Sequence, residues 1–501
     1  MLASLSDAAS GFSVVFEPTN LLFCLIGVTL GMLIGVLPGL GPAATIAILL
    51  PVTYGIDAAP AIIMLAGIFY GAQYGGTITS VLLNLPGEAS TVVTAIDGHA
   101  MAREGRAGAA LGIAAIGSFI GGTISILGLT LLAPVVAGWA LDFGPPEYAA
   151  LAILGILLVS ALSSGSVRAS VLAAAIGLLL ATVGRDPVLG VERFTGGSDN
   201  LADGIDFVVL AMGLFGVGEI LYSLEGLRDR PPPVPQVGKA LPQRDDIRQS
   251  RWAIARGSLV GFILGVLPGG GATMSSLAAY AIEKRSAKQP ERFGKGAIEG
   301  VAGPETANNA AATSSFIPLL TLGIPANGTM AVLFGALLLQ GITPGPLMIT
   351  EHPDVFWGVI DSMYVGNVLL LILSIPLIGL FVRILTVRAG ILAPLTVLIT
   401  LIGVYTVRSN PFDIVAVAVL GGVGYAMKKV GLPPGPLVLA FVLGGLLETS
   451  LRQSLRLFDG DPTGFFERPI SASLLIAAVV LGIGAPAVRA LRARVTIGPA
   501  G

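Results

Sequence analysis

Two stretches of the chain, 230 positions apart, have almost the same sequence. Gly27 to Pro42 reads GVTLGMLIGVLPGLGP, and Gly257 to Ala272 reads GSLVGFILGVLPGGGA. Each places a Gly-Val-Leu-Pro-Gly break inside an otherwise apolar helix. Proline and glycine at such a break free main-chain groups, and membrane carriers use pairs of broken helices to bind a solute or an ion. The duplicated break makes transport the leading hypothesis for the function.

The composition indicates a membrane protein. Of the 501 residues, 54% are hydrophobic and 12% are charged, whereas soluble domains carry about 25% charge. Leu151 to Leu162, Val171 to Val183 and Leu474 to Ile483 lie in apolar stretches of about the length that spans a bilayer. The 68 glycines and 33 prolines then indicate close helix packing and interrupted helices. The expected fold class is all-α, a polytopic integral membrane protein.

Several other classes of site and function have no support in the sequence. A net charge of -2 does not favour nucleic-acid binding, and Cys24 has no second cysteine to pair with. His99 and His352 lack a nearby Cys or carboxylate at metal-ligand spacing, so no transition metal and no cofactor are expected. An enzyme would need a nucleophile beside a base, and no such pair is visible. No Walker A sequence is present either, so active transport would draw on an ion gradient.

Lysine and arginine gather in a few loops, which are expected to face the cytoplasm. These loops are Arg103 to Arg106, Arg228 to Arg256, Lys284 to Lys295, Arg383 to Arg388, Lys428 to Lys429 and Arg489 to Arg494. The apolar spans expected between them are Ala107 to Ala140, Tyr148 to Leu162, Ala169 to Val183, Ile205 to Leu224, Val355 to Leu380, Gly390 to Val407, Ile414 to Met427, Leu437 to Leu447 and Ala472 to Leu491. This scheme places Arg408, Arg452 and Arg456 outside, against the rule. The N-terminus lacks the basic region of a cleaved signal, so the chain is expected to begin at Met1.

The chain is expected to consist of two membrane halves, residues 1–224 and 257–501, joined by a cytoplasmic linker at 225–256. Each half opens with one copy of the repeat, at about 20–106 and about 257–345. The basic segment after the second break is placed inside, whereas its counterpart after the first break has no Lys or Arg. The two copies should therefore have opposite orientations, as an inverted repeat.

A second matched pair of segments follows the breaks. Tyr74 to Thr91 reads YGGTITSVLLNLPGEAST, and Thr313 to Met330 reads TSSFIPLLTLGIPANGTM. Each predicts a re-entrant helical hairpin with a proline turn at its tip, too polar to face lipid. Helix N-termini and uncharged donors at the tips suit a carboxylate; the alternative is that these residues are ordinary helix caps. The candidate substrate-binding residues are Asn84, Pro86, Gly87, Ser90, Thr91, Pro325, Asn327, Gly328 and Thr329.

The most polar stretch in an apolar context is Gly300 to Ser315, GVAGPETANNAAATSS. Glu305 and Asn309 share a helix face at i, i+4, and a carboxylate inside the membrane suggests a site for a coupling Na⁺ or H⁺. A solvent-exposed loop is the alternative. With the backbone of the two breaks as further oxygen ligands, the candidate cation-coupling residues are Gly39, Gly41, Gly269, Gly271, Glu305, Asn308 and Asn309.

Several of these strings, in this order, resemble one protein family. GVLPGLGP, YGGTITSVLLNLPGEAS, DGHAMAREGRAGAALG, GPETANNAA and PLLTLGIPANGTMAVLFGAL are similar to the large membrane subunit, a TctA-like permease, of the tripartite tricarboxylate transporter family. The resemblance runs over essentially the whole chain. It implies a multi-pass permease of the bacterial inner membrane that works with a small membrane subunit and a periplasmic solute-binding protein. It also implies uptake of di- or tricarboxylates such as citrate with a cation gradient.

The expected mechanism is docking of the anion between the two tips, with cations bound nearby and one repeat moving against the rest of the protein. A passive anion channel, or a carrier that needs no binding protein, is the alternative function. A channel would need a continuous polar pore, whereas the polar residues here gather at two breaks. The sequence is compatible with a homo-oligomer.

Overall fold

The structure is a computed structural model that describes residues 2–37, 41–85, 87–163, 166–226, 242–374, 376–384 and 389–480. These residues are almost entirely helical, and eight of their helices are long and apolar enough to cross a membrane. The predicted all-α fold with many membrane spans is confirmed. Two strands of two residues each, β1 (Gly184–Arg185) and β2 (Glu192–Arg193), pair antiparallel and are the exception within the described part.

The helices of the first half are α1 (Leu2–Val15), α2 (Pro18–Gly35), α3 (Pro42–Leu49), α4 (Ala58–Leu83), α5 (Val92–Arg103), α6 (Ala107–Ala140), α7 (Pro145–Leu162), α8 (Val167–Ala181), α9 (Phe207–Ala211) and α10 (Gly218–Gly226). Those of the second half are α11 (Arg244–Val266), α12 (Gly271–Ser286), α13 (Glu299–Ser314), α14 (Phe316–Leu322), α15 (Gly328–Leu339), α16 (Met348–Glu351), α17 (Pro353–Ser374), α18 (Ile378–Ile384), α19 (Ala389–Arg408), α20 (Pro411–Lys429), α21 (Pro434–Leu457), α22 (Gly464–Glu467) and a helix at Pro469–Val480. Short turns of 3-10 helix are η1 (Leu50–Thr53), η2 (Ala89–Thr91), η3 (Asp199–Leu201) and η5 (Pro290–Arg292), and a π-helical segment, η4 (Met212–Val217), joins α9 to α10.

A line of glycines holds α2 against α4 in the first repeat. Gly27, Gly31 and Gly35 follow one another at every fourth position, so they lie on one face of α2. A Cβ atom at each of them would collide with a backbone carbonyl oxygen of α4, those of Met64, Ile68 and Ala72. The two helices therefore touch backbone to backbone, which small residues alone permit.

The second repeat has the same contact, residue for residue. Gly257, Gly261 and Gly265 of α11 face the backbone carbonyl oxygens of α13 at Gly303, Ala307 and Ala311. The glycines are displaced by 230 positions from those of α2, and their partners are displaced by 239 positions from those of α4. The two broken helices thus dock on equivalent hairpin helices, so the similarity seen in the sequence is also a similarity of packing.

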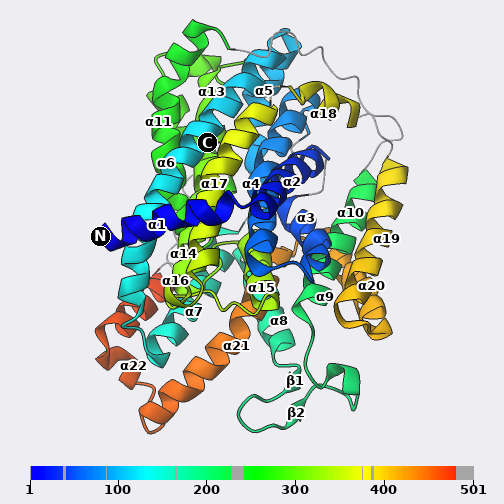
Figure 1. Ribbon diagram of the computed structural model, residues 1–501, viewed down its shortest axis with the longest axis vertical. Coiled ribbons are helices and arrows are strands. Elements are labelled where there is room, and N and C mark those ends of the chain that lie inside the picture. Colours follow the sequence, from blue (N-terminus) through cyan, green and yellow to red (C-terminus); the bar gives the residue numbers. More distant parts are fainter. Residues whose placement is uncertain are drawn as a thin grey trace, which may run out of the picture.

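Figure 1 shows how the two repeats sit in the bundle. α6, drawn in cyan, runs along much of the long axis beside α11 and α13, and α1 lies across the bundle. The 34 residues of α6 make a helix of about 51 Å at 1.5 Å per residue, longer than the hydrocarbon core of about 30 Å. α13 contacts α11, α6, α12 and α4, and is buried from Gly300 to Ser314.

Three expectations from the sequence need correction. The alternative that Gly300 to Ser315 forms a solvent-exposed loop is wrong, because these residues form the buried helix α13; its many Ala and Gly residues let neighbouring helices approach closely. The span expected to reach Leu380 ends at Ser374, and α18 is separate from it. The segment expected as a linker up to Arg256 is helical from Arg244 onward as part of α11.

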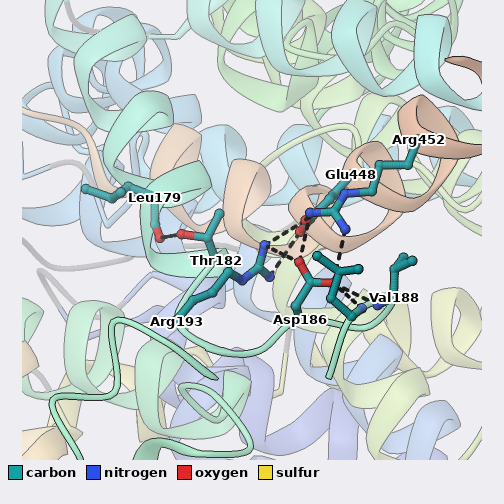
Figure 2. Close-up of polar contacts among 8 residues, drawn as sticks. Leu179, Thr182, Asp186, Val188, Arg193, Glu448 and Arg452 are labelled. Carbon is teal, nitrogen blue, oxygen red and sulfur yellow. Dashed lines mark hydrogen bonds and ion pairs between the residues drawn. The ribbon is translucent and has the colours of Figure 1, made fainter. Parts of the chain in front are cut away.

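An ion-pair network anchors the β1–β2 hairpin to α21 at the lower end of the molecule in Figure 1. Figure 2 shows Arg193 and Arg452 reaching the carboxylates of Asp186 and Glu448. An Arg452 Nη2 to Asp186 Oδ2 distance of 2.8 Å and an Arg193 Nη1 to Glu448 Oε1 distance of 2.7 Å make these charge-assisted hydrogen bonds. Asp186 also accepts from the backbone N–H groups of Val188 and Leu189, both at 2.8 Å.

Other arginines at the same end of the molecule also pair with acids. Arg408 lies 3.8 Å from Asp206 and 4.0 Å from Asp413, and Arg468 lies 2.6 Å from Glu147. Arg408 and Arg452 are two of the three arginines that the topology scheme places outside. The positive-inside rule counts Lys and Arg and gives little weight to acids beside them, so both arginines remain exceptions to that scheme.

Replacing Asp186 with asparagine is expected to loosen the β1–β2 hairpin at neutral pH. Hydrogen bonds from Arg452 and from the backbone of Leu189 hold the pKa of Asp186 well below its usual range. The anchoring is therefore complete above the ordinary aspartate pKa of about 3.9 and is lost as the pH falls through the lower folded value. Limited proteolysis of 184–206 should not change between pH 7 and about pH 5 in the unmodified protein. It should be faster at pH 7 in Asp186→Asn, with the exposed Asp199→Asn as control; equal rates in both variants would contradict the anchor.

Candidate functional site

The site lies at the tip of the first hairpin, Asn84 to Thr91. This tip packs against the Pro-Gly break of the same repeat. A Cβ atom at Gly87 would meet the backbone of Gly76 and the carbonyl oxygen of Gly35. Thr79 Oγ1 donates to the carbonyl oxygen of Val36 at 2.7 Å, so the end of α2 is held on α4. Of the residues predicted from the sequence, Gly39 and Pro86 lie outside the described residues. Gly41 is described and precedes α3 at its N-terminus.

A fully buried carboxylate, Glu305, lies beside this tip. Its two oxygens accept hydrogen bonds from Thr77 Oγ1 and Thr94 Oγ1, each at 2.5 Å. The donors come from α4 and α5 and the acid comes from α13, so three helices meet at this group. No Lys, Arg or His within the described ranges forms an ion pair with Glu305. A buried carboxylate without a cationic partner is costly unless it binds a cation or a proton.

A second carboxylate, that of Glu88, belongs to the same cluster. It accepts a hydrogen bond from Ser90 Oγ. The side-chain amide of Gln73, placed with its nitrogen toward the acceptors, donates to Glu88 and, at 2.9 Å, to Asn308 Oδ1. Glu88 is only partly buried, whereas Glu305 and Asn308 are completely buried. Glu88 is therefore the member of the cluster that a cation arriving from solvent would reach first.

The structure separates the two asparagines that the sequence grouped with Glu305. Asn308 belongs to the cluster, and its Nδ2 is buried without a hydrogen-bond partner in the described part of the chain. Asn309 Nδ2 instead donates to Ser118 Oγ of α6 at 2.7 Å and to the backbone oxygen of Glu305 at 3.2 Å. The side chain of Asn309 thus joins α13 to α6, while that of Asn308 faces the two carboxylates.

Other candidate residues of the first tip have structural roles. Asn84 ends α4 in the left-handed conformation, with φ 56°, which asparagine adopts more readily than most residues. Its side chain is exposed and lies outside the polar cluster. Thr91 Oγ1 accepts from Ser80 Oγ at 2.7 Å and donates to the Glu88 carbonyl oxygen at 3.0 Å, which closes the turn.

The second tip has a different chemistry. Asn327 Oδ1 accepts from the backbone N–H of Met330 at 3.0 Å and so caps α15. The break of the second repeat lies against it, because Gly269 N donates to the Ala326 carbonyl oxygen at 2.7 Å. Gly269 and Gly271 have φ values of 80° and 52°, which favour glycine.

The remaining candidates of this tip complete a site without an acid. Pro325 is buried, and Gly328 and Thr329 are partly exposed. The backbone N–H groups of Gly328 and Thr329 belong to the first turn of α15, where no intrahelical acceptor is available. No Asp or Glu occurs between Gly323 and Gly335. The second tip therefore presents donors to a ligand, whereas the first tip presents two carboxylates.

α12 connects the two tips. It begins at Gly271, next to the Asn327 side chain of the second tip, and it packs against η2 of the first tip. Within the described ranges no hydrogen bond joins one tip directly to the other. The corresponding contact in the other direction is made by α3 of the first repeat, which packs against α15 at the second tip.

Sequence reasoning missed four members of the cluster at the first tip, Gln73, Thr77, Glu88 and Thr94. Gln73 and Thr77 are four residues apart on α4, so they share a face of an otherwise apolar helix. Glu88 is an acid inside a re-entrant tip that was expected to lie away from lipid, and an acid at such a place is itself a sign of function. The residue separations of 228 and 211 positions between Glu305 and its two threonine donors carry no signal in a single sequence.

Comparisons with known proteins assign the chain to one family. Residues 21–439 match the model of the tripartite tricarboxylate transporter TctA family. One relative from Agrobacterium vitis, described as an uncharacterized 52.8 kDa protein in the TAR-I ttuC' 3' region, is 50% identical over 500 residues that cover 99% of each chain. A second protein from the same organism, in the TAR-II ttuC' 3' region, is 53% identical over 240 residues, 47% of this chain and 99% of its own. No solved structure matches.

Proposed function

Because the chain belongs to the tripartite tricarboxylate transporter TctA family, we propose that it takes up small di- or tricarboxylates across the inner membrane of a bacterium by cation symport. The family is one of multi-pass membrane components of transporters that also contain a small membrane subunit and a solute-binding protein.

The observation that carries the proposal is the difference in charge between the tips. Glu88 and Glu305 give the first tip two carboxylates with hydroxyl and amide partners, an oxygen-rich set that suits Na⁺ or H⁺. The second tip has helix N–H groups, Asn327 and no acid, which suit a carboxylate. Cation binding at the first tip would lower the cost of placing an anion nearby, because opposite charges attract strongly where water is excluded.

The packing of the repeats supports movement of one repeat relative to the rest. α12 of the second repeat contacts the first tip, and α3 of the first repeat packs against α15 of the second. This reciprocal exchange is what two units of opposite orientation would produce, and carriers built from inverted repeats alternate access in this way.

Transport by the complete complex in liposomes tests the proposed function. Labelled mono-, di- and tricarboxylates would be offered under a Na⁺ gradient, a proton gradient or neither, with and without the binding protein. Symport predicts uptake against a concentration gradient that stops when an ionophore removes the cation gradient. Uptake that only equilibrates the substrate would indicate a passive anion channel, and uptake without the binding protein would indicate a carrier independent of it.

Asn327→Asp tests the assignment of the anion to the second tip. Aspartate also caps helices well, so α15 should remain folded while a negative charge is added where the substrate carboxylate is expected. The substrate concentration for half-maximal uptake should rise at least about tenfold, since like charges close together cost more than about 1.4 kcal/mol. Ser166→Asp is a control, because it adds the same charge at the N-cap of α8, where Ser166 Oγ accepts from Ala169 N at 3.1 Å. Equal effects of the two substitutions would refute the assignment.

A further inference from the structure

The β1–β2 end of the molecule exposes apolar side chains on a loop that is fixed in place. Leu189 and Phe194 are 71% and 70% exposed, and Val191 is 61% exposed. These residues belong to the hairpin between α8 and α9, beyond the helices at one end of the bundle (Figure 1). Exposed apolar side chains grouped on one loop mark interaction sites more often than single ones do.

The loop carrying these side chains is held by buried charges. Asp186 is 4% exposed, and it binds the guanidinium groups of both Arg193 and Arg452 (Figure 2). Asn200 Oδ1 accepts from Asn410 Nδ2 at 2.9 Å, so the far part of the loop is tied to α20. A preorganised loop loses less conformational entropy when it binds a partner.

The surface around the loop carries an excess of acids. Within the described segment 184–206, three acids are exposed, namely Glu192, Asp199 and Asp203. The exposed arginine in this segment is Arg185. The other arginines at this end, Arg193, Arg408, Arg452 and Arg468, face carboxylates. The exposed charge is therefore negative, which opposes the approach of a free carboxylate and favours a partner with a basic surface.

We propose that the β1–β2 loop, with the apolar Leu189, Val191 and Phe194 and the three exposed acids of 184–206, is the docking surface for the periplasmic solute-binding protein. The inference rests on the proposed function. The apolar side chains would fill the desolvated centre of the contact and the acids would form its charged rim. The binding protein should therefore present a basic rim, and the acids should accelerate its arrival.

Uptake by the reconstituted complex at varied binding-protein concentration tests the docking surface. In the double variant Leu189→Ser, Phe194→Ser, the concentration of binding protein for half-maximal uptake should rise at least about tenfold, with little change in the maximal rate. Asp199→Lys with Asp203→Lys should raise that concentration too, and should weaken its dependence on salt. The control is Trp252→Ser on α11, with a side chain 61% exposed elsewhere on the molecule.

A photo-crosslinking amino acid at position 189 keeps the test decisive if the double variant folds poorly. Crosslinking to the purified binding protein, but not from position 252, would support the docking surface. Crosslinking to lipid, or unchanged half-saturation in folded variants, would overturn it. Wild-type uptake that needs no binding protein would instead overturn the proposed function, so the two failures can be told apart.

Discussion

Glu305→Gln is expected to remove the cation dependence of uptake while the protein stays folded. Glutamine has nearly the same shape, and its amide can still pair with Thr77 and Thr94, whose hydroxyl groups both donate and accept. It has no negative charge, so a bound Na⁺ would lose its strongest ligand and a transported proton would have no site. Uptake driven by the cation gradient should fall at least about 100-fold, corresponding to about 2.7 kcal/mol.

Further variants and titrations distinguish Na⁺ from H⁺ as the coupling ion, and Glu88 from Glu305 as its ligand. Glu88→Gln should give a similar loss if the carboxylates share one cation, and a smaller loss if Glu305 alone is the ligand. Na⁺ titrations should lose their saturation if Na⁺ is the coupling ion, and pH profiles should become flat if it is H⁺. Glu299→Gln is the control on the same helix, because Glu299 lies at the N-terminal end of α13, 3.5 Å from Arg292. Normal Na⁺ and pH dependence in both Glu88→Gln and Glu305→Gln would exclude the cation site.

Gly261→Val is expected to prevent the second repeat from packing. A Cβ atom at Gly261 would collide with the backbone oxygen of Ala307 and the Cβ of Ala310. Rotamer changes cannot relieve a clash with backbone, so α11 and α13 would have to separate. Overpacking usually costs about 1–3 kcal/mol, and a clash between two backbones should lie at or above the upper end of that range. The yield of monodisperse protein in detergent and its melting temperature should both fall sharply.

Gly31→Val should have the same effect in the first repeat, because Gly31 faces the backbone of Ile68. Gly422→Val on α20 is the matched control, since a Cβ atom there meets nothing within 4 Å. It carries the same change in helix propensity, so any difference from Gly261→Val reports the packing alone. A similar melting temperature for Gly261→Val and Gly422→Val would contradict the backbone contact.

The sequence predicted the elements of this fold because each is encoded locally. The long apolar stretches, the paired Pro-Gly breaks and the spacing of Gly27, Gly31 and Gly35 can all be read along one segment. The burial of Gly300 to Ser315 could not be read in this way, because its polarity fits an exposed loop as well as a polar site between helices. Its small residues point to a buried helix only once it is known that α6, α11 and α12 pack around it.

The candidate site was predicted in part, and the missing part depends on the third dimension. Glu305 and Asn308 stand out by their polarity, but Thr77 and Thr94, which donate to Glu305, are ordinary residues until the helices meet. Asn309 follows Asn308 directly, yet a step of about 100° around a helix turns its side chain to another neighbour. Asp361 shows the same limit. It lies inside α17, 1% exposed, and its Oδ2 has no hydrogen-bond partner among the described residues.

The glycine contacts restrict where this protein can flex. Two helices in direct backbone contact cannot slide past each other by a fraction of a turn. Each carbonyl oxygen of one helix already occupies the space that a side chain would fill at a glycine of the other. Each of the pairs α2 with α4 and α11 with α13 should consequently behave as a rigid unit. Any rearrangement that opens the carrier first to one compartment and then to the other must take place at helix interfaces lined by larger side chains. These side chains can exchange rotamers as the two helix pairs move.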